Sequence, residues 1–140
     1  EQLAAFDEAS QFVDAFNAKW RPVLSAGKAT PEAKRLLQEY RADWQAQWQA
    51  LQVFAQREIM IPRAGEILWS KADSIRIGDG DEASVKIRRC TDSRDNGATE
   101  AGKPLNPPET PTEVVTTVDR DVDGKWLIYG TESAEKACAA

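Results

Sequence analysis

The chain has 140 residues, 29% of them charged, and a formal net charge of −5 at pH 7. This length suits a single domain over residues 1–140, which is large enough to form a hydrophobic core without a metal or a disulfide. The acidic balance, with Lys and Arg interspersed among the acids, argues against nucleic acid and anionic membrane surfaces as partners. No apolar run approaches the roughly 20 residues of a transmembrane segment.

The first element in the chain is an expected helix over residues 2–20. Apolar residues recur there at spacings of three and four, which places them on one helical face. Pro22 is expected to stop this helix or to follow its end, because proline lacks a backbone N–H. The residues of the apolar face are Phe6, Ala9, Val13, Phe16 and Trp20.

A second helix is expected over residues 31–58, either continuous or with a break near Phe54. Thr30 suits its N-cap, and Pro31 is favoured as a first helical residue. Its apolar stripe is also at helical spacing. The residues of the stripe are Leu37, Tyr40, Trp44, Trp48, Leu51 and Ala55.

From residue 59 the pattern changes to that of strands and turns, which predicts an antiparallel sheet over residues 59–131. Asp79-Gly80 and Asp123-Gly124 are tight-turn dipeptides, and each is expected to join two strands into a hairpin. Between the hairpins, residues 94–111 are polar and rich in Pro, which predicts a mobile loop. Helices followed by an antiparallel meander indicate an α+β fold.

The two cysteines, Cys90 and Cys138, indicate the compartment. A disulfide between them would tie the C-terminal tail to the sheet, contribute roughly 4 kcal/mol in the chain-entropy model, and place the protein outside the reducing cytosol. The alternative is two buried free thiols in a cytosolic protein. Cys90 is out of phase with Val85 and Ile87, so either the strand bulges or the thiol points to the opposite face.

This order of elements resembles the NTF2-like superfamily, whose fold is a cystatin-like, cone-shaped α+β arrangement. More narrowly, the chain is similar to secreted or lipid-anchored NTF2-like proteins of actinobacteria. The resemblance implies two N-terminal helices packed on a strongly curved antiparallel β-sheet with a pocket at the mouth of the cone. It does not imply one activity, since members include isomerases, dehydratases, binding proteins and scaffold domains. The residues that carry it are those at 79–85, Cys90, those at 123–128, and Cys138.

Catalytic chemistry is restricted by the absence of histidine. Histidine-based general catalysis, Ser-His-Asp and Cys-His arrangements, and histidine metal sites are all excluded. One arrangement stays open, in which Tyr40 or Tyr129 lies beside a carboxylate such as Asp14 or Asp43. The alternative is that Tyr40 belongs to the edge of the core and the acids lie on solvated helix faces.

A weak calcium candidate is formed by Asp119, Asp121 and Asp123, which match the first half of a calcium-binding loop. The bidentate Glu of that loop should fall at Gly130 and is absent. The residues after the turn also favour a strand over a helix. An acidic hairpin is therefore the expected structure, and no metal or other cofactor is expected.

Aromatic side chains either fill the core or line a concave pocket between the second helix and the sheet, suited to an apolar or flat ligand. Arg41, Arg57, Arg88 and Arg89 either supply a polar group to that pocket or pair with surface acids. The candidate pocket residues are Tyr40, Trp44, Trp48, Trp69, Trp126 and Tyr129.

The expected function is that of a non-enzymatic, extracytoplasmic binding or assembly module of the cell envelope, secreted or membrane-anchored, with the signal or anchor outside this sequence. Its expected partner is an unknown envelope protein that contacts residues 94–111, or a small apolar ligand, and a homo-oligomer is a further expectation. One alternative is a small-molecule isomerase or dehydratase that uses a pocket carboxylate and a Tyr. The other is a subunit of a conjugation or secretion apparatus. The sequence alone identifies neither ligand nor partner.

Overall fold

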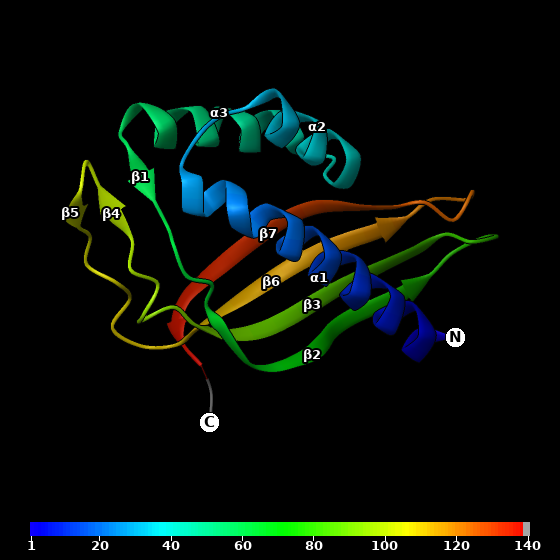
Figure 1. Cartoon of the computed structure of the whole chain (residues 1–140). Helices are drawn as coiled ribbons and strands as arrows, with labels where there is room; N and C mark the ends of the chain where they lie inside the picture. Colours follow the sequence, from blue (N-terminus) through cyan, green and yellow to red (C-terminus); the bar gives the residue numbers. More distant parts are fainter. Residues whose placement is uncertain (139–140) are drawn as a thin grey trace.

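The computed structural model describes residues 1–138, except for the side chains of residues 134 and 135. In this part of the chain, three helices cover one face of a four-stranded antiparallel sheet (Figure 1). The last two residues of the predicted domain 1–140 lie outside the described part. The arrangement confirms the predicted α+β class, with N-terminal helices packed on a curved antiparallel sheet. The helices are α1 (Gln2–Ala26), α2 (Pro31–Tyr40) and α3 (Trp44–Gln56).

Helix α1 is longer than the predicted helix 2–20. It continues through Pro22 and ends at Gly27, whose φ of 64° lies in the left-handed region that suits a helix C-cap. The Ile61 N–H donates a hydrogen bond to the Leu24 carbonyl at 2.9 Å, which ties the last turn to the chain after α3. The expectation that Pro22 stops the helix or follows its end is wrong, because tertiary contacts of this kind offset the one helical hydrogen bond that proline lacks.

The predicted second helix, residues 31–58, is divided into α2 and α3 between Tyr40 and Trp44, whereas Phe54, where a break was considered, lies within α3. Thr30 caps α2 as predicted, since its side chain accepts a hydrogen bond from a first-turn N–H at 3.1 Å. Arg41 then adopts an extended conformation and forms a parallel bridge with Ile128 of the sheet. The Ala42 N–H donates to the Ile128 carbonyl at 2.9 Å. Pairing with the sheet interrupts the helix even though the apolar stripe continues past the break.

The main sheet has the strand order β2-β3-β6-β7, with each neighbouring pair antiparallel, and both predicted hairpins are present. A smaller sheet, β1-β4-β5, lies at one end (Figure 1). Its strands β4 and β5 fall inside residues 94–111, and an Arg57–Glu100 ion pair of 2.8 Å links β4 to the end of α3. Strand β7 extends past the predicted end at residue 131. The strands are β1 (Ile59–Met60), β2 (Glu66–Ile77), β3 (Ala83–Asp92), β4 (Thr99–Glu100), β5 (Lys103–Pro104), β6 (Thr112–Arg120) and β7 (Trp126–Ala137).

The core lies between α1 and the face of the sheet that the helices cover. Val85 and Ile87 of β3 are fully buried on that face, whereas Lys86 between them is exposed on the other face. Ala5 and Ala9 of α1 are also fully buried in this cluster. Their short side chains let the first half of α1 pack closely on the strands.

A disulfide joins Cys90 of β3 to Cys138, with an S–S distance of 2.03 Å and a Cα–Cα distance of 5.8 Å. The pairing of β3 with β6 is continuous from Ala83 to Thr91, so no bulge lies in that ladder. Cys90 therefore points away from the helices, as strand alternation from Val85 and Ile87 requires. The predicted bridge is confirmed, and the covalent link lies on the face of the sheet opposite α1.

Replacing Cys138 by Ser is expected to lower the free energy of unfolding by about 4 kcal/mol while leaving the fold in place, because the bridge closes a long loop and the core lies elsewhere. Denaturant unfolding with far-ultraviolet circular dichroism measures both effects. Cys90→Ser should give the same loss, and the double variant no further loss, since each removes the same bond. Loss of helical signal in either single variant would contradict the prediction.

The turn after β3 is held by Asp92, whose carboxylate accepts hydrogen bonds from the Arg94 guanidinium at 2.9 and 2.8 Å and from the Arg94 N–H at 3.1 Å. These bonds, the side-chain ones first, lower the pKa of Asp92 from 3.8 to about 2. A depressed carboxyl pKa adds stability above its unfolded value, and that stability is lost as the pH falls toward the folded value.

A carboxyl-carbon NMR titration is therefore expected to give Asp92 a midpoint of about 2. Arg94→Gln should move the midpoint up toward the ordinary aspartate value. An ordinary midpoint in the unmodified protein would show that this turn is not held as described.

Candidate functional site

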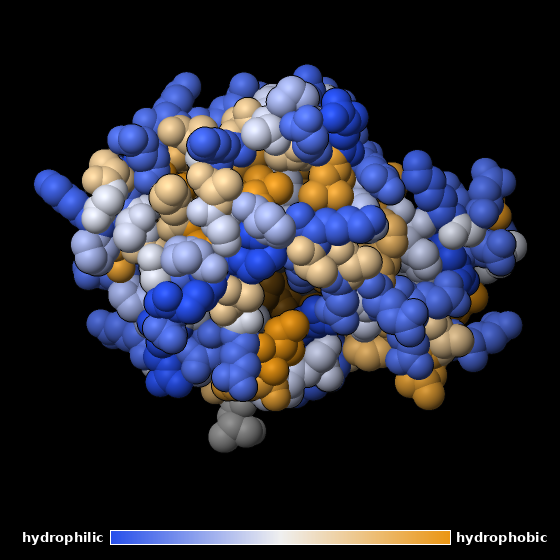
Figure 2. All heavy atoms as spheres, in the orientation of Figure 1, coloured by the Kyte–Doolittle hydropathy of each residue, from blue (hydrophilic) through white to orange (hydrophobic). Residues whose placement is uncertain are grey.

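In the described part of the chain, a cavity opens on each face of the main sheet. The interlayer cavity, about 400 Å³, lies between the second half of α1 and the sheet. The outer groove, about 500 Å³, lies near the hairpin turns on the face that no helix covers. Figure 2 shows a hollow with hydrophobic atoms at its bottom on the side where, in Figure 1, α1 crosses the sheet.

The interlayer cavity has a buried base, an apolar wall and a polar rim. Its base combines two arginines with apolar and hydroxyl side chains, all of them buried. An apolar wall with a few convergent polar groups is the usual composition of a small-molecule site. The base residues are Val13, Arg41, Arg89, Thr116 and Ile128; wall residues include Trp20, Leu24, Ile67 and Val114; and rim residues include Asp14, Asn17 and Thr131.

Arg41 reaches the base from the break between α2 and α3. Its guanidinium donates to the Asp43 carboxylate through Nε at 2.7 Å and through Nη2 at 3.0 Å, and its side chain is only 8% exposed. It also lies over the Phe16 ring, 5.6 Å from the centroid, and Nη2 donates to Thr131 at 3.4 Å. The two-point pairing with Asp43 neutralises a charge that would be costly to bury alone.

Arg89 reaches the base from β3. Its Nη1 donates to the Asp14 carboxylate of α1 at 2.7 Å, and its Nε donates to Ser70 of β2 at 3.2 Å. Asp14 is 58% exposed at the rim, so this pair connects the buried base to solvent. The pair also holds the middle of α1 against the sheet.

Arg21 is the third arginine of the interlayer cavity, and it has no carboxylate partner among the described residues. Its Nη2 donates to the Ile61 carbonyl, while its Nε is buried and has no hydrogen-bond partner. Burial lowers the pKa of Arg21 from its ordinary value. Arg21 was not among the predicted site residues, because the first helix was expected to end at residue 20, whereas α1 continues to Ala26.

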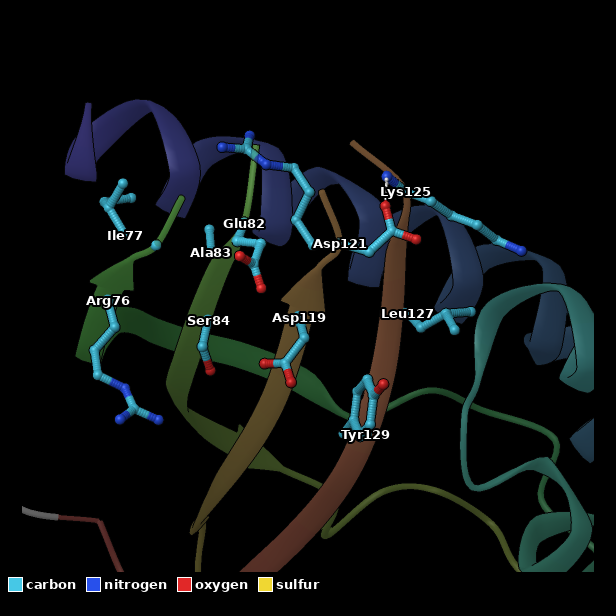
Figure 3. Close-up of a pocket in the computed structure, with 12 residues that line it drawn as sticks. Arg76, Ile77, Glu82, Ala83, Ser84, Asp119, Asp121, Lys125, Leu127 and Tyr129 are labelled. Atoms are coloured by element: carbon cyan, nitrogen blue, oxygen red, sulfur yellow. Dashed lines mark hydrogen bonds between the residues drawn. The ribbon is translucent and has the colours of Figure 1, made fainter. Parts of the chain in front are cut away.

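The outer groove is open to solvent and is lined by charged side chains of both signs and by apolar side chains. Arg76, Ser84 and Asp119 come from three neighbouring strands in register, and Figure 3 shows them on the same side of the sheet as Tyr129. Tyr129 is 53% exposed. Asp121 accepts hydrogen bonds from two N–H groups of its own turn, at 3.0 and 2.9 Å. Charges of both signs alternate here without an apolar enclosure, so the interlayer cavity is the better candidate for a binding site.

The aromatic residues predicted to line a pocket lie mostly outside both cavities. Tyr129 lines the outer groove, and the aromatic residue that lines the interlayer cavity is Trp20, which was not predicted to do so.

The other predicted aromatic residues belong to the core or lie beside it. Tyr40 and Trp126 are buried in the core, and Trp44 and Trp48 pack against it, with Lys34 within 6 Å of the centroids of both rings. Trp69 is partly buried on β2, where Lys71 lies 4.4 Å from its ring centroid. Periodicity placed these rings on the correct elements but did not show which end of the layer interface stays open.

The proposed tyrosine–carboxylate pairs do not form. The Tyr40 hydroxyl accepts a hydrogen bond from Lys19 at 3.0 Å, whereas Asp14 and Asp43 pair with the two buried arginines. Of the four arginines considered from the sequence, Arg41 and Arg89 line the interlayer cavity. Arg88 pairs with Asp73 and Glu113 on the opposite face, and Arg57 pairs with Glu100.

The calcium candidate separates into different roles in the β6–β7 hairpin. Asp121 caps the turn, and Asp119 lies in the outer groove with a buried Oδ1 that has no hydrogen-bond partner. Asp123 donates its N–H to Asp121 and is exposed. No group of three or more His, Cys, Asp or Glu side chains in the described part of the chain is placed to hold a metal ion. The three carboxylates therefore do not converge.

Comparisons with known proteins find a distant structural likeness. No family model matches the chain, and no curated protein matches it. Among solved structures, the intermembrane space region of chloroplast protein ARC6 aligns with a TM-score of 0.48 and 15% sequence identity, over 88% of this chain and 94% of that one. Similarity at this level carries no argument about ligand or activity. Within residues 1–138, no helix is both long and apolar enough to cross a membrane.

Asp43→Ala is expected to lower the free energy of unfolding by about 3 kcal/mol, because it leaves the buried Arg41 guanidinium without its counter-charge. Glu32→Ala is the matched control, since it removes an exposed pair with Arg35 and should cost about 0.5 kcal/mol or less. Urea unfolding measures both. The double variant Arg41→Met with Asp43→Ala should recover part of the loss. Equal effects of Asp43→Ala and Glu32→Ala would contradict the assignment.

Proposed function

We propose that this chain is a non-enzymatic, extracytoplasmic binding module of NTF2-like architecture, and that its interlayer cavity holds a small ligand with an apolar body and a polar end. The interlayer cavity is the observation that carries the proposal. It lies between a helix and a curved sheet, has a wall formed by residues such as Trp20, Leu24 and Val114, and has hydroxyl and guanidinium groups at its base. Such a site buries a small molecule and orients it through a few polar contacts.

The composition of the cavity favours binding over isomerase or dehydratase chemistry. Asp14 is the one carboxylate among the described lining residues, and its side chain is 58% exposed and paired with Arg89 at 2.7 Å. A carboxylate that abstracts a proton near neutral pH needs desolvation to raise its pKa. The buried polar groups of the cavity are instead arginines and a threonine, which bind and orient without exchanging protons.

The disulfide supports a location outside the reducing cytosol, because stable disulfides are rare in cytosolic proteins. We propose the cell envelope as the compartment, because the hairpins and the two cysteines resemble those of secreted or lipid-anchored NTF2-like proteins. The helix-covered curved sheet and the cavity at one end of the layer interface are the features that an NTF2-like cone would show.

Val114→Phe tests the cavity, because Val114 lines it from β6 and the larger phenyl ring would fill part of its volume. Val115→Phe is the matched control, since the next residue points to the opposite face of the same strand and both changes suit a strand. Amide chemical shifts would be recorded with a set of small aromatic compounds that differ in one polar end: hydrocinnamate, hydrocinnamamide and phenylpropylamine.

In the unmodified protein and in Val115→Phe, at least one of these compounds is expected to shift the amide signals of Asn17, Thr91 and Val114. In Val114→Phe the shifts should be absent while the folded spectrum is retained. The proposal fails if none of the compounds moves these signals, or if Val114→Phe binds them as well as the control does.

A further inference from the structure

The charges around the interlayer cavity do not balance. Arg21, Arg41 and Arg89 line it, and Asp14 is the one acid among its described lining residues. Arg41 is neutralised by Asp43 and Arg89 by Asp14, at 2.7 Å in each case. One positive charge is left over, and it belongs to Arg21.

Arg21 is positioned to receive an anion. It lines the cavity and has no carboxylate partner among the described residues, and its buried Nε has no hydrogen-bond partner within the protein either. Nη2 is already bonded to the Ile61 carbonyl, which holds the guanidinium in place. Asn17 lies one helical turn before Arg21 on the same side of α1 and also lines the cavity, so its amide is a neutral donor nearby.

We infer that the ligand of the interlayer cavity is a small organic monocarboxylate, with its carboxylate at Arg21 and its apolar body against the wall that Trp20, Leu24 and Val114 help to form. The inference rests on the function proposed above and adds the chemical class of the ligand. A guanidinium matches a carboxylate in shape, because it can donate two parallel hydrogen bonds to the two oxygens. One uncompensated positive charge suits a monoanion, whereas a phosphate dianion would leave a negative charge in a partly buried site.

Isothermal titration calorimetry with hydrocinnamate, hydrocinnamamide, phenylpropylamine and inorganic phosphate tests the inference. The first two compounds have the same apolar body and differ in the charge of the polar end. Hydrocinnamate is expected to bind about tenfold more tightly than the amide, the ratio typical of a hydrogen bond to a charged group. The amine should bind more weakly than the amide, and inorganic phosphate, at a pH above its second pKa where it is a dianion, should give no heat of binding.

Arg21→Gln should weaken hydrocinnamate about tenfold and leave hydrocinnamamide within about twofold, so that the preference for the acid disappears. Unchanged binding of the amide also shows that the cavity is still formed. Arg21→Lys, which retains the charge, should keep part of the preference. Arg35→Gln is the control, because Arg35 is an exposed arginine on α2 outside the cavity, and it should change neither affinity.

The outcomes separate this inference from the proposed function. If the acid and the amide bind equally, or if Arg21→Gln weakens both by the same factor, the carboxylate assignment is overturned and the binding cavity stands. If neither compound binds and the amide signals of the cavity do not move, both proposals fail.

Discussion

The packing of α1 along the sheet is the constraint on which the rest of the structure depends. At one end, Ala5 and Ala9 meet the fully buried Val85 and Ile87, and short helix side chains let the two layers close on each other. Toward the other end, residues of α1 such as Arg21 face polar side chains of the strands. At this end the Arg89–Asp14 ion pair of 2.7 Å joins β3 to α1, and the side chains around it leave about 400 Å³ unfilled between the layers. The interlayer cavity is the space that results.

The buried arginines are part of this geometry. Arg41 enters the base of the cavity only because the chain leaves the helical conformation there and pairs with Ile128 of β7. Its charge is tolerated because Asp43, two residues later, neutralises it at two points. The break between α2 and α3, the bridge to β7 and the ion pair therefore depend on one another. The disulfide acts independently on the other face of the sheet, where it fastens the end of β7 to β3.

Sequence patterns predicted the elements better than their ends. Local signals that act within a few residues were sufficient for the Thr30 cap and for both Asp-Gly hairpins. The extension of α1 through Pro22 and the break at Arg41 were missed, because both depend on hydrogen bonds to residues far away in the chain. The candidate site was predicted in part: Arg41 and Arg89 were considered for a pocket, whereas Arg21 was not, because the first helix was expected to end at residue 20.

The sequence by itself determined the fold class, the strand alternation and the number of cysteines available to pair. It carried this information because periodicity and turn chemistry are local properties of the chain. Only the tertiary structure decided which aromatic rings fill the core, where the helix layer separates from the sheet, and that Arg21 has no counter-charge among the described residues. These properties depend on distances between residues from separate elements, and no local pattern in the chain encodes them.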